Sequence, residues 1–99
     1  MATLLVKHTV EDYETWKTHF DDHASTRKEY GERGYRLFNV SEDPNELVTL
    51  WEWDSAESVQ KFMDESDVRE VMGESGVIGE PEMYFLNEVE DKTPETLSA

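Results

Sequence analysis

Apolar and polar residues alternate near the start of the chain, and this alternation predicts a β-strand over residues 3–10. The apolar residues then recur every three or four positions, which predicts a single helix that begins near residue 12 and ends near Tyr30. Gly31 and Gly34 follow, and glycines at these positions end the helix and turn the chain.

A second strand is predicted over residues 35–41 and a third over residues 47–53. A turn over residues 42–46 separates them, because Pro and Asn favour turn backbones. The third strand is apolar on both faces, with Leu47, Trp51 and Trp53 on one side and Val48 and Leu50 on the other. A strand of this kind needs cover on both faces.

Asp54 is the expected N-cap of a second helix, with Glu57 three residues later as its capping-box partner. An acidic run over residues 64–67 ends that helix, and a short helix over residues 68–72 comes next. A glycine-rich loop then leads to the last strand, over residues 83–89. The predicted element order is therefore βαββαβ.

This order predicts an α+β, ferredoxin-like fold, in which a four-stranded antiparallel sheet carries its helices on one face. The first and third strands lie in the middle of that sheet. We expect residues 1–89 to form one domain and residues 90–99 to form a polar C-terminal tail.

The second face of the sheet lacks cover in a single chain. Each large apolar side chain left exposed there forfeits roughly 1.5–3 kcal/mol of burial energy. We therefore expect a homodimer in which two sheets pack face to face and form an α/β barrel. The side chains expected at that dimer interface are Leu37, Trp51 and Tyr84.

The charge of the chain limits its partners. Its 99 residues include 24 acidic and 9 basic side chains, a formal charge of −15. Such a chain repels phosphate backbones and anionic membrane surfaces, so we expect neither nucleic acid nor membrane as a partner. The acidity favours a halophilic source, because molar salt shortens the Debye length to about 3 Å and screens carboxylate repulsion.

The chain has no cysteine, which excludes disulfides, thiolate metal ligands and cysteine nucleophiles. The apolar run Leu4-Leu5-Val6 is too short for a signal peptide, and no segment is long and apolar enough to span a membrane. We therefore expect a cytoplasmic protein.

Two local motifs resemble those of a known superfamily. They are Val6-Lys7-His8 on the first strand and Trp51-Glu52-Trp53-Asp54-Ser55-Ala56-Glu57-Ser58 at the junction of the third strand and second helix. With the βαββαβ order, they resemble the dimeric α/β-barrel superfamily over residues 2–89. Its members include antibiotic-biosynthesis monooxygenase-like proteins, stress-responsive A/B-barrel proteins and polyketide cyclases. The resemblance implies a dimeric barrel, but one fold hosts many functions.

His8 is the best candidate for a catalytic residue. It shares the strand face of Leu4 and Val6, and histidine can move protons near neutral pH. In cyclases of the superfamily, the resemblance implies that a histidine matching His8 takes part in proton transfer, together with a tyrosine and a second histidine. Phe62 and Val68 stand at those two positions and cannot transfer a proton. The alternative is a core histidine bonded to a backbone carbonyl.

A pocket for a flat apolar molecule could be lined by large side chains from both helices. These candidate ligand-binding residues are Tyr13, Trp16, His23, Phe62, Met63 and Met72. The alternative is that they are ordinary core, which aromatic and Met residues at helical spacing usually are. Arg27 and Arg36 could each bind a ligand carboxylate or phenolate, or could form a surface ion pair instead.

His19 and His23 lie four residues apart on one side of the first predicted helix, a spacing that can hold a metal. No third ligand is evident, so the sequence predicts no metal site, and it points to no cofactor. In haem-degrading relatives the resemblance implies a histidine that has no counterpart here on the second helix.

Three functions remain open. The first is a homodimeric protein that binds a small aromatic or hydrophobic molecule between sheet and helices. The second is a cofactor-independent monooxygenase or polyketide-cyclase-like enzyme with His8 as general base. The third is an interaction module with a filled core. The sequence leaves open whether the protein is an enzyme, and a cavity beside His8 would separate the first two from the third.

Overall fold

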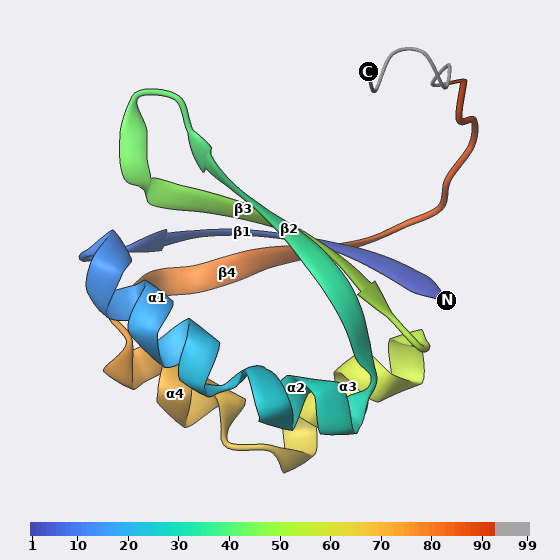
Figure 1. Cartoon of the computed structure of the whole chain (residues 1–99), viewed down its shortest axis with the longest axis horizontal. Helices are drawn as coiled ribbons and strands as arrows, with labels where there is room; N and C mark the ends of the chain where they lie inside the picture. The colour runs from blue at the N-terminus through green and yellow to red at the C-terminus, as the bar shows by residue number, and fades with distance from the viewer. Residues whose placement is uncertain (93–99) are drawn as a thin grey trace.

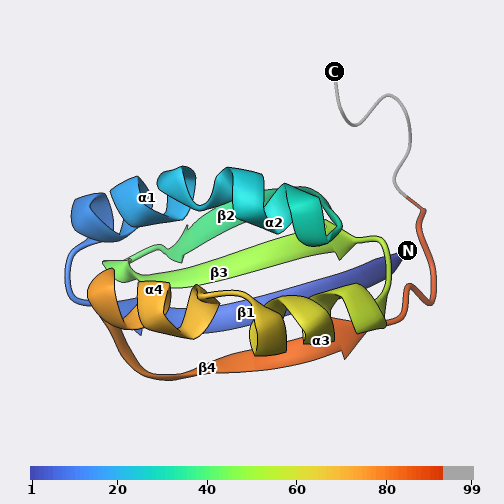
Figure 2. The same cartoon turned by 90° about the horizontal axis from the view of Figure 1, so that it is seen from below.

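The computed structural model describes residues 1–92 (Figure 1). The predicted polar tail over residues 90–99 lies outside the described residues from residue 93 onward. Four strands form one antiparallel sheet in the order β2-β3-β1-β4. The strands are β1 (Ala2–Val10), β2 (Glu32–Val40), β3 (Asp43–Trp53) and β4 (Val77–Leu86). The helices are α1 (Tyr13–Asp22), α2 (Ala24–Tyr30), α3 (Ala56–Glu65) and α4 (Val68–Glu74). Figure 2 shows that all four helices cover the same face of the sheet. The predicted ferredoxin-like α+β fold is confirmed, with β1 and β3 in the middle.

The first predicted helix is divided into two. Its backbone leaves helical values at His23, with φ −88° and ψ 1°, and α1 ends there. The His23 imidazole lies 2.8 Å from Asp67, which stands at the junction between α3 and α4. A side-chain hydrogen bond therefore joins the break between α1 and α2 to the break between α3 and α4. The local spacing of apolar residues does not reveal this long-range contact.

The predicted turn over residues 42–46 is wrong. The turn consists of Ser41 and Glu42, and Val40 pairs with Asp43 across it, so β3 already includes residues 43–46. Asn45 is held in the strand because its side chain accepts a hydrogen bond from the Tyr13 amide at 2.9 Å. Pro44 is tolerated because it lies near the start of the strand, where its missing N–H does least harm.

The predicted cap of the second helix is also wrong by one residue. Ser55 is the N-cap of α3, and its hydroxyl accepts a hydrogen bond from the Ser58 amide at 3.1 Å. Asp54 instead forms an ion pair with Arg33 at the start of β2. The last strand begins at Val77 rather than Met83, because its first residues already pair with the end of β1.

The core lies between the sheet and the helices. Leu4 of β1 faces Trp51 of β3, and both are buried with Trp53 and Phe62 in one cluster. A second cluster joins Val10, Trp16 and Leu47, and Phe20 packs against both clusters. The helix face of β3 thus supplies most of the sheet's contribution to the core.

Two of the three residues expected at the dimer interface lie on the other face of the sheet from the one predicted. Trp51 is buried under the helices, and Leu37 is partly buried there, packed against the second cluster. The register decides this, because Leu37 pairs with Thr49 and therefore shares the inward face of β3. Only Tyr84 points away from the helices, in the same row as Leu5 and Leu50.

The face opposite the helices, here called the open face, remains rich in apolar side chains. Leu5 and Leu50 lie at its centre. Several large side chains on the open face keep a considerable exposed fraction: Phe38 43%, Ile78 51%, Tyr84 53% and Leu86 40%.

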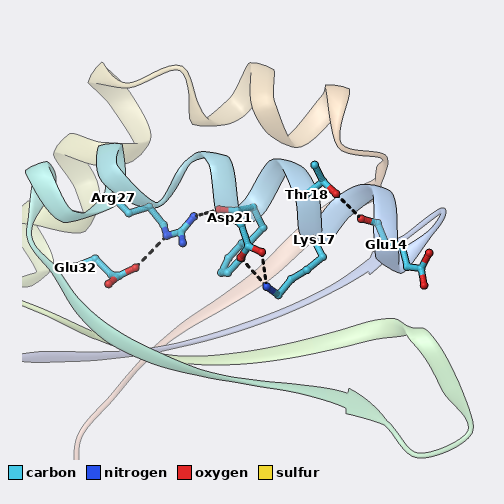
Figure 3. Close-up of polar contacts among 7 residues, drawn as sticks. Glu14, Lys17, Thr18, Asp21, Arg27 and Glu32 are labelled. Atoms are coloured by element: carbon cyan, nitrogen blue, oxygen red, sulfur yellow. Dashed lines mark hydrogen bonds and ion pairs between the residues drawn. The ribbon is translucent and has the colours of Figure 1, made fainter.

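An ion pair lies beneath α2. Arg27 donates from Nε to Glu32 Oε1 at 3.0 Å, and both side chains are only 4% exposed (Figure 3). Arg27 Nη1 also donates to the Phe20 carbonyl at 2.7 Å. Two buried charges are tolerated because they neutralise each other and share their hydrogen bonds. The surface ion pair considered for Arg27 is therefore replaced by a buried one.

Glu32→Gln should lower the free energy of unfolding by about 3–5 kcal/mol in urea denaturation, because it leaves the Arg27 charge buried without its partner. The double substitution Arg27→Met with Glu32→Leu should recover most of that loss, because it removes both charges.

The matched control is Asp21→Asn, which breaks the exposed ion pair that Lys17 forms with Asp21 at 2.6 Å (Figure 3). It should change the free energy of unfolding by less than about 1 kcal/mol. If Glu32→Gln and Asp21→Asn lowered the free energy of unfolding equally, the buried ion pair would stabilise the fold no more than the exposed one.

Candidate functional site

A cavity lies between the sheet and the two helix pairs, and its volume is about 110 Å³. We call it the helix-side cavity. The sheet lines it with Leu4, Val6 and His8, and the helices line it with Phe20, Phe62 and Met72, among other mostly apolar side chains. A volume of about 10–15 Å³ holds one water molecule, so the cavity has room for several waters or for one compact apolar molecule.

The structure brings most of the predicted site residues together at this cavity. Trp16, His23, Phe62, Met63 and Met72 all line it. Tyr13 does not, because it packs beside the second core cluster, nearer to Leu37 and Leu47. The helical spacing that grouped these residues cannot tell which end of the first helix lies over the cavity.

His8 lines the cavity from β1, where it pairs with Leu47 of β3. Its ring centroid lies 5.3 Å from that of Trp16, at an angle of 53°. Nδ1 of His8 is buried and has no hydrogen-bond partner among residues 1–92. The alternative interpretation of His8, a core histidine bonded through this nitrogen to a backbone carbonyl, is therefore not observed within residues 1–92. The nitrogen is enclosed by neighbouring protein atoms, while other atoms of the His8 side chain line the cavity.

Burial lowers the pKa of His8, because the charged imidazolium loses its hydration. The ring is therefore neutral at neutral pH and can accept a proton there. An uncharged base in an apolar cavity can take part in proton transfer or hold a ligand hydroxyl. No other titratable group is paired with His8 in the described chain.

His23 is already engaged by another residue. Its Nε2 lies 2.8 Å from Asp67 Oδ1, and the hydrogen bond holds the pKa of the Asp67 carboxyl below its usual range. The His23 ring also packs near Phe62, with centroids 5.7 Å apart. His23 therefore contributes to the cavity wall and to the link between the helix pairs.

The two histidines of α1 do not form a metal site in the described residues. His19 donates from Nδ1 to the Thr15 carbonyl at 3.0 Å, while His23 faces Asp67. No group of three potential ligands occurs within residues 1–92. The helices of this range also include none that is long and apolar enough to cross a bilayer.

Some residues of the site were not identified from the sequence. Thr49 and Trp53 line the cavity, and both share the inward face of β3 with Trp51. The alternation along this strand could have found them. Arg27, already a ligand-binding candidate from the sequence, also lines the cavity. Its partner Glu32 was not identified, and it lies on a strand that was predicted to start three residues later. No sequence signal marks that pair.

This fold, with a cavity beneath its helices, is that of the dimeric α/β-barrel superfamily. The family model for antibiotic biosynthesis monooxygenase matches residues 3–74, and the chain belongs to that family. No curated protein matches the chain in sequence.

Solved structures share this fold. SnoaB, a cofactor-independent oxygenase from Streptomyces nogalater, superposes with a TM-score of 0.72 at 12% identity, covering 92% of this chain and 97% of that one. A Bordetella bronchiseptica protein with a provisional antibiotic biosynthesis monooxygenase name gives 0.76 at 13% identity, covering 90% and 97%. At these identities the likeness shows the fold alone.

The lowered pKa of His8 predicts how stability depends on pH. As pH falls through about 6.5, the histidine of the unfolded chain gains a proton before the folded one does. The free energy of unfolding should therefore decrease between about pH 6.5 and the lower pKa of folded His8. Proton NMR titration of the imidazole should give that pKa directly.

His8→Gln should remove this part of the pH dependence, whereas His19→Gln should retain it. A folded-state pKa at or above about 6.5 for His8 would contradict the burial argument.

Proposed function

We propose that the protein is a homodimer that binds a compact aromatic or hydrophobic molecule in the helix-side cavity. The observation that carries this proposal is the unpartnered Nδ1 of His8 in the wall of a mostly apolar cavity. A completely filled core would have left no such space. An apolar cavity of about 150 Å³ binds benzene, and the helix-side cavity, at about 110 Å³, is smaller but of the same order.

The open face supports the dimer. Leu5 and Leu50 lie at its centre, and Tyr84 and Leu86 are exposed on β4 beside them. A second sheet packed on this face would remove these side chains from water, at roughly 25 cal/mol per Å² of apolar surface. The formal charge of −15 on each chain opposes association, and salt screens that repulsion. The dimer should therefore be tighter in molar KCl than in dilute buffer.

Tyr84→Glu should weaken the dimer at least tenfold, because it places a charge in the apolar contact. The dissociation constant is measured by sedimentation equilibrium in molar KCl and in dilute buffer. Val89→Glu is the matched control, since Val89 is 95% exposed and lies beyond the end of β4. A Tyr84→Glu protein with an unchanged dissociation constant would rule out the open face as the interface.

A cofactor-independent oxygenase with His8 as general base is the second candidate. The lowered pKa of His8 favours it, because the neutral ring can remove an acidic proton from a bound substrate. Dioxygen would then oxidise the resulting anion. In the overall reaction a methylene becomes a carbonyl, and the second oxygen atom leaves as water. Oxygen consumption that rises with pH through the His8 pKa and is lost in His8→Gln would establish this activity.

Binding is tested with tetralin, a bicyclic hydrocarbon, by calorimetry. The wild type should bind it with a micromolar to millimolar dissociation constant, since a ligand of this size makes no stronger contact without polar partners. Val71→Trp should reduce the affinity at least tenfold by filling the cavity that Val71 lines.

Val89→Trp is the control for the added indole ring, and it should bind tetralin like the wild type. Absence of any tetralin binding by the wild type would refute a ligand cavity and favour an interaction module.

A further inference from the structure

Helix α4 forms one wall of the helix-side cavity and is only loosely attached to the core. Val68, Val71 and Met72 of α4 line the cavity, but Val68 alone is buried. Figure 2 shows α4 lying over β1, between α1 and the edge strand β4. A helix of seven residues is not stable by itself in water, so α4 depends on these few contacts. Segments with few buried apolar contacts open locally before the rest of a protein unfolds.

Both ends of α4 are joined to the fold through residues with non-helical backbones. Ser66, between α3 and α4, has φ −88° and ψ 175°, and its hydroxyl accepts a hydrogen bond from the Val68 amide at 3.1 Å. Gly76, beyond α4, has φ +90°, which glycine adopts without strain. The Gly76 carbonyl accepts a hydrogen bond from the Glu11 amide at 2.9 Å. Residues of this kind at the ends of an element are where hinges occur.

A single side-chain hydrogen bond ties α4 to the opposite helix pair. His23 Nε2 lies 2.8 Å from Oδ1 of Asp67, the residue that immediately precedes α4. Within residues 1–92, no other side-chain hydrogen bond joins the two helix pairs. The His23 side chain is 10% exposed, whereas that of Asp67 is 60% exposed. Because the carboxylate is already largely hydrated, it can exchange the imidazole N–H for water at little cost.

We propose that α4 is a lid over the helix-side cavity and that the hydrogen bond between His23 and Asp67 is its latch. The wall of the cavity is rigid while this bond is made. When the bond breaks, α4 leaves the sheet, with Ser66 and Gly76 as hinges, and opens the side of the cavity that it lines. As a control of ligand access, this inference rests on the proposed binding function. The opening of α4 itself is measured without a ligand.

Native-state hydrogen exchange, followed by NMR at several urea concentrations in molar KCl, tests the lid. The amides of Val71 and Ser75 donate to carbonyls at Asp67 and Val71, so they exchange only when α4 is disrupted. Because α4 is unstable away from the sheet, its opening exposes these amides. In the wild type they should exchange at least tenfold faster than the slowest amides of β3. Their exchange should also depend less on urea, since local opening exposes less surface than global unfolding does.

Asp67→Ala tests the latch, because it removes the acceptor of the His23 hydrogen bond. The α4 amides should then exchange about three- to tenfold faster than in the wild type, since the closed state has lost a bond that the open state never makes. Asp67→Asn keeps an acceptor oxygen and should remain within twofold of the wild type.

Glu70→Ala is the matched control for the lost charge. Glu70 is exposed in the first turn of α4, and its removal leaves the latch intact. Charge effects are screened in molar KCl, so the α4 amides of Glu70→Ala should exchange within twofold of the wild-type rate.

Stopped-flow binding of tetralin tests whether the lid controls access. All three tryptophans of the chain, Trp16, Trp51 and Trp53, line the cavity, so their fluorescence reports binding there. In Asp67→Ala the association and dissociation rate constants should both rise about three- to tenfold. The dissociation constant should stay within twofold, because the latch closes the lid with or without a ligand.

The outcomes separate the two proposals. If the wild type does not bind tetralin, the proposed binding function fails, while hydrogen exchange still decides whether α4 opens. Amides of α4 that exchange with the same urea dependence as those of β3 would overturn the lid. Unchanged exchange of the α4 amides in Asp67→Ala, or a rise in the dissociation rate constant alone, would overturn the latch.

Discussion

The structure depends on the burial of one face of β3. Leu47, Thr49, Trp51 and Trp53 all point toward the helices, and each is almost completely buried. Because side chains alternate along a strand, placing the two tryptophans inward also determines which residues of the neighbouring strands face the helices. Leu4, pairing with Trp51, joins the core, while its neighbour Leu5 faces outward. Both helix pairs then pack on a wall that β3 has largely defined.

The same packing explains why a cavity remains. Large rings at Trp16, Phe20 and Phe62 hold the helices above the sheet, while β1 offers only Leu4, Val6 and His8 beneath them. The rings cannot close the space completely, and the His23–Asp67 hydrogen bond ties the two helix junctions together at 2.8 Å. The cavity therefore has a rigid apolar wall with a few polar atoms placed in it, as ligand sites commonly do.

Much of the fold followed from local patterns. Period-two alternation identified the strands, and the three- and four-residue spacing identified the helices, because each pattern reflects one buried face. The break at His23 and the early start of β3 at Asp43 escaped these patterns. In both places a distant side chain decides the backbone. Asp67 holds the ring of His23, and Asn45 bonds the start of α1.

The sequence by itself determined the element order, the family resemblance and the inward position of His8, because these depend on neighbours along the chain. Only the tertiary structure decided that Trp51 and Leu37 face the helices, since strand register is a contact between distant segments. It also decided that Arg27 is buried against Glu32, with Nη2 lacking a hydrogen-bond partner among residues 1–92. Whether a charge lies in water or in the core depends on the segments packed around it, and these are not its neighbours in sequence.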